Sequence, residues 1–272
     1  PDKIVLQRAL NPANNSVLPA LDFNGVDAFA PATANMTIGN PLNGDSFNTV
    51  TTFWSNTSTY GATFSAQPSS AASPVVVSSV PAAKLAAGDI HEVFLEGNQP
   101  SFTSGRISVS YVAGVSDRTE TLPTALGFTT VSQLSSSPYY RFRALAPVGS
   151  DYTSVSRLLF YQFATVSSPV DRLIFVLQTS GYLGATPGTN WDLAIPDFTG
   201  VAGFSTVWMP NTANIIFRTE GFGGPGPLLF GATPSAGDFI KFAYRWQSPG
   251  ALGLVAAPVR RTNLTRPQYL RR

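Results

Sequence analysis

The sequence predicts an all-β sandwich or barrel, and three observations support this fold class. Residues 237–249 (GDFIKFAYRWQSP) open on a turn, alternate aromatic with other side chains and close at a proline, as a β-strand does. Similar runs recur along the chain between Gly, Pro and Asn clusters, at a spacing typical of sandwiches and barrels. With 272 residues, 43% of them hydrophobic, the chain suits one large all-β domain or two small ones.

Residues 1–48 are rich in Asn, Pro, Ala and Asp and contain few alternating runs, so we expect an extended N-terminal arm. Loops this long are unusual inside a compact domain and are typical of an arm that reaches over a neighbouring subunit. The apolar residues expected at such an interface are Phe23, Phe29 and Met36. Regular strands are expected from about Thr51, where a broken β pattern surrounds Trp54 and Tyr60.

The middle of the chain contains most of the predicted strands. They are PVVVSSVP (74–81), HEVFLEGN (91–98), GRISVSYVAGVS (105–116), YYRFRALAP (139–147), SRLLFYQFATVS (156–167) and DRLIFVLQTSG (171–181). The runs RLLFYQF and RLIFVLQ are continuously apolar, which predicts central strands covered on both faces. Residues 82–87 predict one helical turn, and residues 122–134 (LPTALGFTTVSQL) predict a short helix.

The last third of the chain is more irregular. We expect loops between residues 181 and 210, with DLAIPDF and FSTVWMP as short strands, and then a strand at NIIFRTEG. A Gly- and Pro-rich stretch forbids regular structure through much of residues 221–238, which predicts a long loop beside the last strand. In this loop, Phe222 and Leu228 are candidate interface residues. We therefore expect a core domain over residues 49–250 and a basic tail over 251–272, in which Arg260 and Arg261 are further interface candidates.

The low content of charged residues bears on whether the chain associates with other subunits. Charged residues make up only 12% of the chain, about half the roughly 25% usual in soluble domains. A surface of hydroxyls, amides and apolar atoms associates easily, so much of it is either buried against other subunits or is the uncharged polar surface of a secreted β-protein. The chain has no cysteine, hence neither a disulfide nor a thiolate metal site, and no apolar run of about 18 residues that would span a membrane.

An N-terminal arm, eight or more strands, short helical turns and a polar tail together resemble a viral jelly roll. The sequence Gly237-Asp238-Phe239, followed by an aromatic strand and Pro249, is similar to the last core strand of picornavirus-like capsid proteins of small positive-strand RNA viruses of insects and marine algae. Residues 105–112 resemble an inner strand of these subunits. The resemblance implies a jelly-roll β-sandwich of about eight core strands, matched by pattern over roughly residues 50–250.

The same resemblance implies a function. The chain would be a structural subunit of a non-enveloped icosahedral capsid, cut from a polyprotein and located in the virion, and in the host cytoplasm during assembly. Its partners would be copies of itself and sister subunits, with genomic RNA and a host receptor as possible further partners, and no cofactor is expected. The Arg-rich tail could contact RNA phosphates or dock on a neighbouring subunit.

One catalytic candidate comes from the resemblance. Some insect-virus relatives carry an Asp-Asp-Phe motif linked to autocatalytic cleavage of a precursor, and Asp238-Phe239 matches its last two positions, with Gly237 in place of the first Asp. Asp238 could assist such a cleavage if buried and perturbed, or it could only cap a turn.

Apart from this candidate, we do not expect the chain to be an enzyme. His91 is the only histidine, which excludes two-His metal sites, and no GxSxG motif surrounds a serine. We expect His91 at the surface or at an interface.

The alternative function is a secreted carbohydrate-binding or adhesive β-sandwich. Its stacking face would be formed by Trp54, Tyr60, Trp191 or Trp208. Asp192 and Asp197, beside Trp191, are either an acid pair for glycoside cleavage or ordinary strand-end residues. A third group of acids, Asp22, Asp27 and Asp45, could hold calcium or serve as turn residues.

Overall fold

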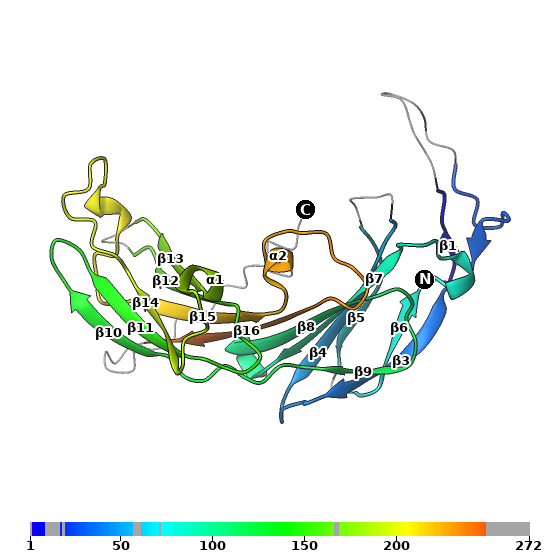
Figure 1. The fold of residues 1–272 in the computed structure, drawn as a ribbon, viewed down its shortest axis with the longest axis horizontal. Helices are drawn as coiled ribbons and strands as arrows, with labels where there is room; N and C mark the ends of the chain where they lie inside the picture. Colours follow the sequence, from blue (N-terminus) through cyan, green and yellow to red (C-terminus); the bar gives the residue numbers. More distant parts are fainter. Residues whose placement is uncertain are drawn as a thin grey trace.

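Eight strands of the protein form a single antiparallel sheet that extends along much of the molecule in the computed structural model (Figure 1). In order across the sheet they are β13 (Arg172–Thr179), β12 (Val155–Gln162), β15 (Ile216–Gly223), β16 (Phe239–Gln247), β8 (Ser104–Val112), β7 (Ile90–Asn98), β4 (Ser46–Trp54) and β5 (Gly61–Ser70). The structure describes residues 2–8, 17, 20–56, 72–165 and 169–248, and for 61–70 the course of the chain alone. The expected strand at residues 237–249 is confirmed as β16, in the middle of the sheet.

Two three-stranded sheets form the second layer and lie towards opposite ends of the large sheet (Figure 1). One consists of β6 (Val75–Ser79), β3 (Ala32–Gly39) and β9 (Arg118–Thr121); the other consists of β10 (Thr130–Ser135), β11 (Arg141–Pro147) and β14 (Asn190–Ala194). A short pair, β1 (Ile4–Val5) and β2 (Ala28–Phe29), lies outside both. The predicted all-β sandwich is therefore confirmed, with one continuous layer facing a divided one.

The strand register gives the large sheet two distinct faces. The inner face packs against the small sheets: Val93 and Leu95 contact the β3–β6 side, and Leu158 and Phe160 contact the β11–β14 side. Successive side chains of a strand point to opposite faces, so the residues that alternate with these in each strand belong to the outer face. There, Phe94, Ile107, Phe222 and Ile240 form a cluster with the turn α2 (Gly226–Leu229), which lies over the middle of the sheet (Figure 1).

The N-terminal segment departs from the predicted arm. Regular strands begin not near Thr51 but with β3, whose side chains alternate between buried and exposed. Met36 is fully buried in this strand, in a cluster with Phe47 and Leu95. The Asn and Pro content of the region reflects the turns around β3 and β4 rather than a free arm, and the alternating pattern in ATANMTIG was too short and too weakly apolar to stand out.

The predicted helix at residues 122–134 is wrong. Residues 122–129 are extended and cross the inner face, and β10 begins at Thr130. Leu122 and Leu126, spaced as on one helix turn, pack in two different clusters of the core. The backbone of this crossing segment forms hydrogen bonds with side chains in place of the bonds within a helix. Arg106 donates to the carbonyl oxygen of Pro123 (3.1 Å), and the Thr124 N–H donates to Asp151 (2.8 Å).

The other short elements agree in part with expectation. The predicted helical turn at 82–87 is present as η1 (Ala82–Lys84). FSTVWMP forms no strand but contains the turn η3 (Thr206–Trp208), and the remaining short helices are η2 (Pro100–Phe102) and α1 (Ser180–Leu183). The basic tail at 251–272 lies outside the described residues.

Candidate functional site

The outermost strand of the large sheet, β13, leaves an apolar row uncovered. The sequence predicts a central strand covered on both faces, which is wrong, because β13 pairs with β12 on one side and with no further strand among the described residues. On the outer face Leu173, Phe175 and Leu177 are 43%, 54% and 50% exposed. We call these three residues the β13 row.

The other face of β13 explains why the strand is apolar throughout. Ile174 and Val176 pair with Phe160 and Leu158 and pack against the core beneath the second small sheet. Those inner positions secure β13 to the sandwich, so folding of the chain does not require the β13 row to be apolar. The exposed residues therefore need an explanation outside the isolated chain.

Arg157 of β12 lies next to the β13 row on the outer face. Its guanidinium carbon is 5.6 Å from the ring centre of Phe175, and its side chain forms an ion pair with the buried Glu220 of β15. Arg218 approaches the same carboxylate at 2.8 Å. Because Glu220 anchors Arg157, Phe175 lies against a group of fixed position rather than a mobile surface cation.

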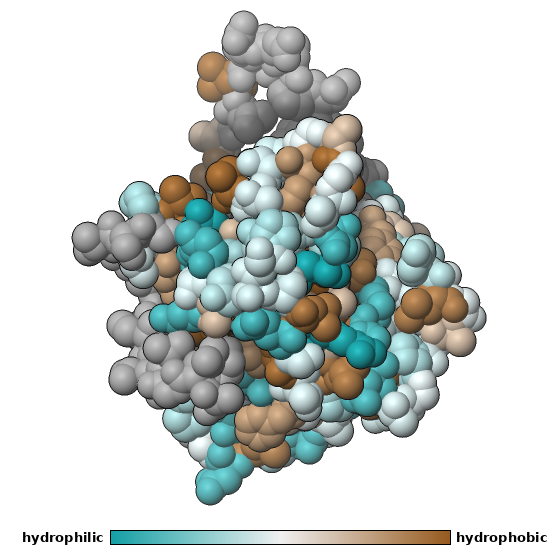
Figure 2. Space-filling model, turned by 90° about the vertical axis from the view of Figure 1, so that its left-hand side faces the viewer, coloured by the Kyte–Doolittle hydropathy of each residue, from teal (hydrophilic) through white to brown (hydrophobic). Residues whose placement is uncertain are grey.

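Further exposed apolar side chains lie at both ends of β13. At its start, Arg172 Nε donates to the carbonyl oxygen of Val207 (3.0 Å), which places η3 beside the strand, and Val207 and Trp208 are exposed there. At its end the chain enters α1, where Tyr182 and Leu183 are exposed. Figure 2 faces the end of the molecule that carries these elements and shows hydrophobic groups interspersed with hydrophilic ones.

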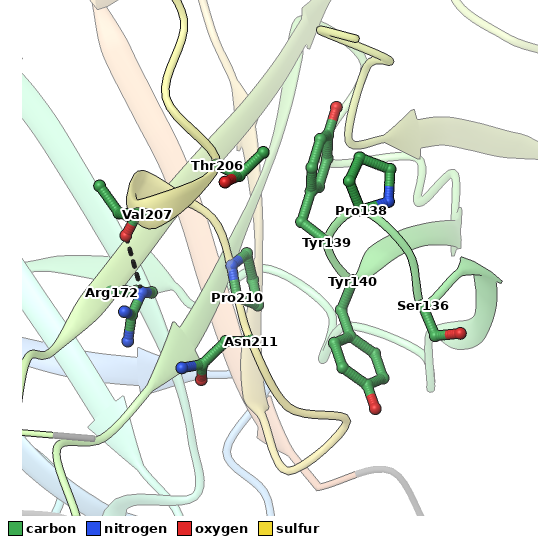
Figure 3. A pocket seen from close by; sticks show the side chains of 9 residues that line it. All are labelled: Ser136, Pro138, Tyr139, Tyr140, Arg172, Thr206, Val207, Pro210 and Asn211. Atoms are coloured by element: carbon green, nitrogen blue, oxygen red, sulfur yellow. Dashed lines mark hydrogen bonds between the residues drawn. The ribbon is translucent and has the colours of Figure 1, made fainter. Parts of the chain in front are cut away.

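A shallow hollow of about 240 Å³ lies between η3 and the start of β11, near the beginning of β13 (Figure 3). Tyr139, Tyr140, Arg172, Pro210 and Asn211 are among the residues that line it. Its volume is below the range of roughly 300–1,000 Å³ that is usual for small-molecule sites. Since the Tyr139 hydroxyl already accepts the Phe198 N–H (2.7 Å), it is committed to holding the 196–210 loop.

Asp192 and Asp197, the alternative acid pair for sugar chemistry, have structural partners. Asp192 forms two bonds with Arg143, which lower the pKa of the Asp192 carboxyl, and Asp197 pairs with Arg141 at 3.0 Å. The Thr199 N–H donates to Asp197 and lowers the pKa of that carboxyl as well. Trp191 is buried in the core, so it cannot stack on a sugar.

The predicted interface residues fall into three groups. Phe23 is exposed, and Phe29 is half-buried with the Lys84 ammonium 5.4 Å from its ring centre. Three others are buried core residues, which corrects their assignment as interface candidates: Met36, Phe222 and Leu228. Arg260 and Arg261 lie outside the described residues.

His91 is not the surface or interface residue that the sequence predicts. It is fully buried on β7, where its Nε2 accepts the Val80 N–H (3.2 Å) and its Nδ1 faces the Ala113 carbonyl oxygen (3.2 Å). These partners fix the neutral tautomer that carries its proton on Nδ1. Burial lowers the pKa of His91.

The remaining acidic candidates occupy turns or pair with basic groups. Asp238 accepts the Ser235 N–H (2.8 Å) and so caps the turn before β16. Asp45 is buried against Arg106, and Asp22 accepts the Asn24 N–H (2.8 Å). In the part of the chain that the structure describes, no three His, Cys or acidic side chains are grouped so as to hold a metal ion.

Comparison of the chain with protein-family models, curated proteins and solved structures gives no match. Within the described residues, the helices are too short to cross a bilayer. The β13 row is therefore the feature on which a functional argument can be built. Sequence reasoning missed its three residues because it assigned RLIFVLQ to the core. No local signal in the sequence could have revealed them, because the order in which strands pair depends on contacts between distant segments.

Proposed function

We propose that the chain is a structural subunit that assembles with other subunits through the edge of its large sheet. The observation that carries this proposal is the β13 row. An eight-residue edge strand with exposed apolar side chains invites pairing with another chain, and monomeric proteins commonly block such edges with Lys, Pro or a bulge. The eight residues of β13 contain no Lys or Pro, and their register with β12 is unbroken.

In its narrower form, the proposal is a subunit of a non-enveloped icosahedral capsid around an RNA genome. This form rests on the resemblance of residues 237–249 to a capsid strand, and the all-β sandwich and the low content of charged residues are consistent with it. The subunit contributes surfaces for assembly, and catalysis is no part of this role. Asp238 as a turn cap needs no further role in it.

The experiment is to measure particle mass and shape by sedimentation velocity and electron microscopy, on the chain and on material from its natural source. We expect closed particles of uniform size, with RNA and sister chains of similar mass in the natural material. A chain that stays monomeric across the accessible concentration range, in both preparations, would contradict the proposal.

A pair of variants ties assembly to the edge. Phe175→Lys places a charge in the β13 row and should reduce assembly, because burying an unpaired ammonium at an interface is costly. The matched control is Leu134→Lys, at a residue of similar exposure on the edge strand β10 of the second layer. The control should assemble as the parent does. Equal loss in both variants would assign the effect to charge alone.

The alternative, carbohydrate binding, keeps one supporting observation. Trp208 is 61% exposed in η3, and Thr206 and Val207 of the same turn line the hollow of Figure 3; an exposed aromatic face could stack on a sugar ring. Of the other aromatic candidates, Trp54 is largely covered in the outer-face cluster and Tyr60 lies outside the described residues. Glycan-array binding that is lost in Trp208→Ala, by a chain that forms no particles, would favour this function over assembly.

A further inference from the structure

We propose that the partner of β13 is β13 of a second copy of this chain, paired antiparallel about a two-fold axis at Phe175. The inference rests on the proposed assembly function and names the partner and register of the same edge. The sequence of the β13 row reads the same in both directions, Leu173-x-Phe175-x-Leu177. An antiparallel pair centred on Phe175 places the two Phe175 rings opposite each other and each Leu173 opposite a Leu177.

The two faces of the sheet restrict where the two-fold axis between the two copies of β13 can lie. Because side chains alternate along a strand, a two-fold pairing keeps the β13 rows on one common face only if the axis stands perpendicular to the sheet and passes midway between the two copies of one residue. Moving the centre from Phe175 to Ile174 would leave Leu177 opposite Asp171 of the other copy. Moving it to Val176 would leave Leu173 opposite Thr179. The centre at Phe175 is thus the register that matches all three apolar positions.

Charge supports this register. Arg172 would lie opposite Gln178, and Asp171 opposite Thr179, so no like charges face each other across the axis. On the inner face Ile174 would meet Val176. Cross-strand apolar pairs of this kind stabilise a sheet, whereas like charges directly opposite destabilise it.

The geometry suits an assembly contact of moderate strength. A two-fold contact is isologous, so one row satisfies both partners and the contact closes on itself. The eight-stranded sheets of two copies would become one continuous layer across the axis. Two edge strands alone bury less than the roughly 1,000 Å² that stable interfaces need, so this contact requires others to complete a shell.

The absence of cysteine from the chain makes the register directly testable. Directly opposite residues of an antiparallel pair have Cα atoms about 4.5–5.5 Å apart, within the range that a disulfide spans. We would prepare Phe175→Cys, Leu173→Cys and Leu177→Cys separately, oxidise each under mild conditions and follow dimer formation on non-reducing gels. Phe175→Cys should cross-link at least about tenfold faster than either flanking variant, because only its thiols meet their own copies.

A second measurement guards against a folding defect in one variant. An equimolar mixture of Leu173→Cys and Leu177→Cys chains should give the mixed dimer much faster than either variant gives its own. Rapid self-cross-linking of Leu173→Cys or Leu177→Cys would place the axis elsewhere and overturn the register. Failure of both the Phe175→Cys dimer and the mixed dimer, while the parent chain forms particles, would overturn the inference and leave the assembly function standing.

The two proposals therefore fail separately. A discrete Phe175→Cys dimer from a chain that forms no larger particle would support the β13 pairing and overturn the shell. A chain that neither cross-links nor forms particles would overturn both.

Discussion

The strands β12 and β13 have nearly the same sequence and quite different surroundings. β12 reads RLLFYQ from Arg157 and lies between two strands; β13 reads RLIFVLQ from Arg172 and lies at the edge of the sheet. Inward-facing Leu158 and Phe160 are buried, and outward-facing Leu159 is buried too, whereas its cross-strand partner Phe175 is half exposed. The same composition thus serves as core in one strand and as uncovered surface in the next.

The difference indicates what a continuously apolar strand can mean. Such a run predicts that both faces are covered in the functional protein, but it does not say by which chain. In β12 the cover comes from the chain itself. In β13 we infer that it comes from a second copy, and measurements on the two strands can test that contrast.

The largest expected effect is the difference between two Phe→Ala variants. Phe160→Ala removes a buried ring and should lower the free energy of unfolding by about 3–5 kcal/mol. Phe175→Ala, measured at a concentration where the chain is monomeric, should lower it by less than about 1 kcal/mol, because water already reaches the ring. Urea unfolding followed by tryptophan fluorescence measures both. Similar losses in the two variants would mean that the β13 row is covered within the chain.

Most of the fold could be predicted from local pattern. Strands with clear alternation or a strongly apolar run, such as β7, β8, β11 and β16, lie where the sequence predicts them. Pattern failed where tertiary contacts decide: Gly127 already weakens the interior of the predicted helix, and the hydrogen bonds that its backbone forms with Arg106 and Asp151 hold it extended. The pairing order of strands, which exposes Phe175, depends on contacts between distant segments and has no local signal.

An effect of intermediate size is the pH dependence of the free energy of unfolding, which should come from the buried His91 and not from the edge strand β13. In the folded chain burial lowers the pKa of His91 below its ordinary value of 6.5, so the unfolded chain binds more protons as the pH falls below about 6.5. The contribution of the neutral ring is complete above that pH and is lost as the pH falls from 6.5 towards the folded pKa. We therefore expect the free energy of unfolding to decrease between pH 6.5 and pH 5, measured by urea titration at each pH.

The control for this prediction is His91→Gln. It should be flatter between pH 5 and pH 6.5, because the surface carboxylates Asp192 and Asp197 have lowered pKa values and lose their contribution only at more acidic pH. Burial raises the pKa of Glu96, so this carboxyl favours folding more as the pH falls and opposes the His91 slope equally in both chains. Disulfide formation by Phe175→Cys, corrected for thiolate fraction, should not follow the His91 titration, since the β13 row is apolar. An unchanged slope in His91→Gln would show that another group titrates in this range.

The smallest expected effect concerns one side-chain contact between the two strands, that of the Arg157 guanidinium with the Phe175 ring. A double-mutant cycle with Arg157→Lys and Phe175→Leu should give a coupling of about 0.5 kcal/mol, because Lys lacks the planar group and Leu lacks the ring face. The comparison cycle pairs Arg157→Lys with Leu173→Ala, whose residue lies opposite Tyr161 instead, and should be additive within about 0.3 kcal/mol. Both cycles are measured by urea unfolding of the monomeric chain.

The sign of the coupling bears on how the edge binds. A favourable coupling means that Arg157, fixed by Glu220, holds the Phe175 ring in place before any partner arrives, so that less side-chain entropy is lost on pairing. In that case Arg157→Lys should also slow the pairing of β13 with β13 of a second copy. The register found by cross-linking should not change. A coupling of zero would mean that the ring is free on the surface, and that β13 differs from β12 in order as well as in exposure.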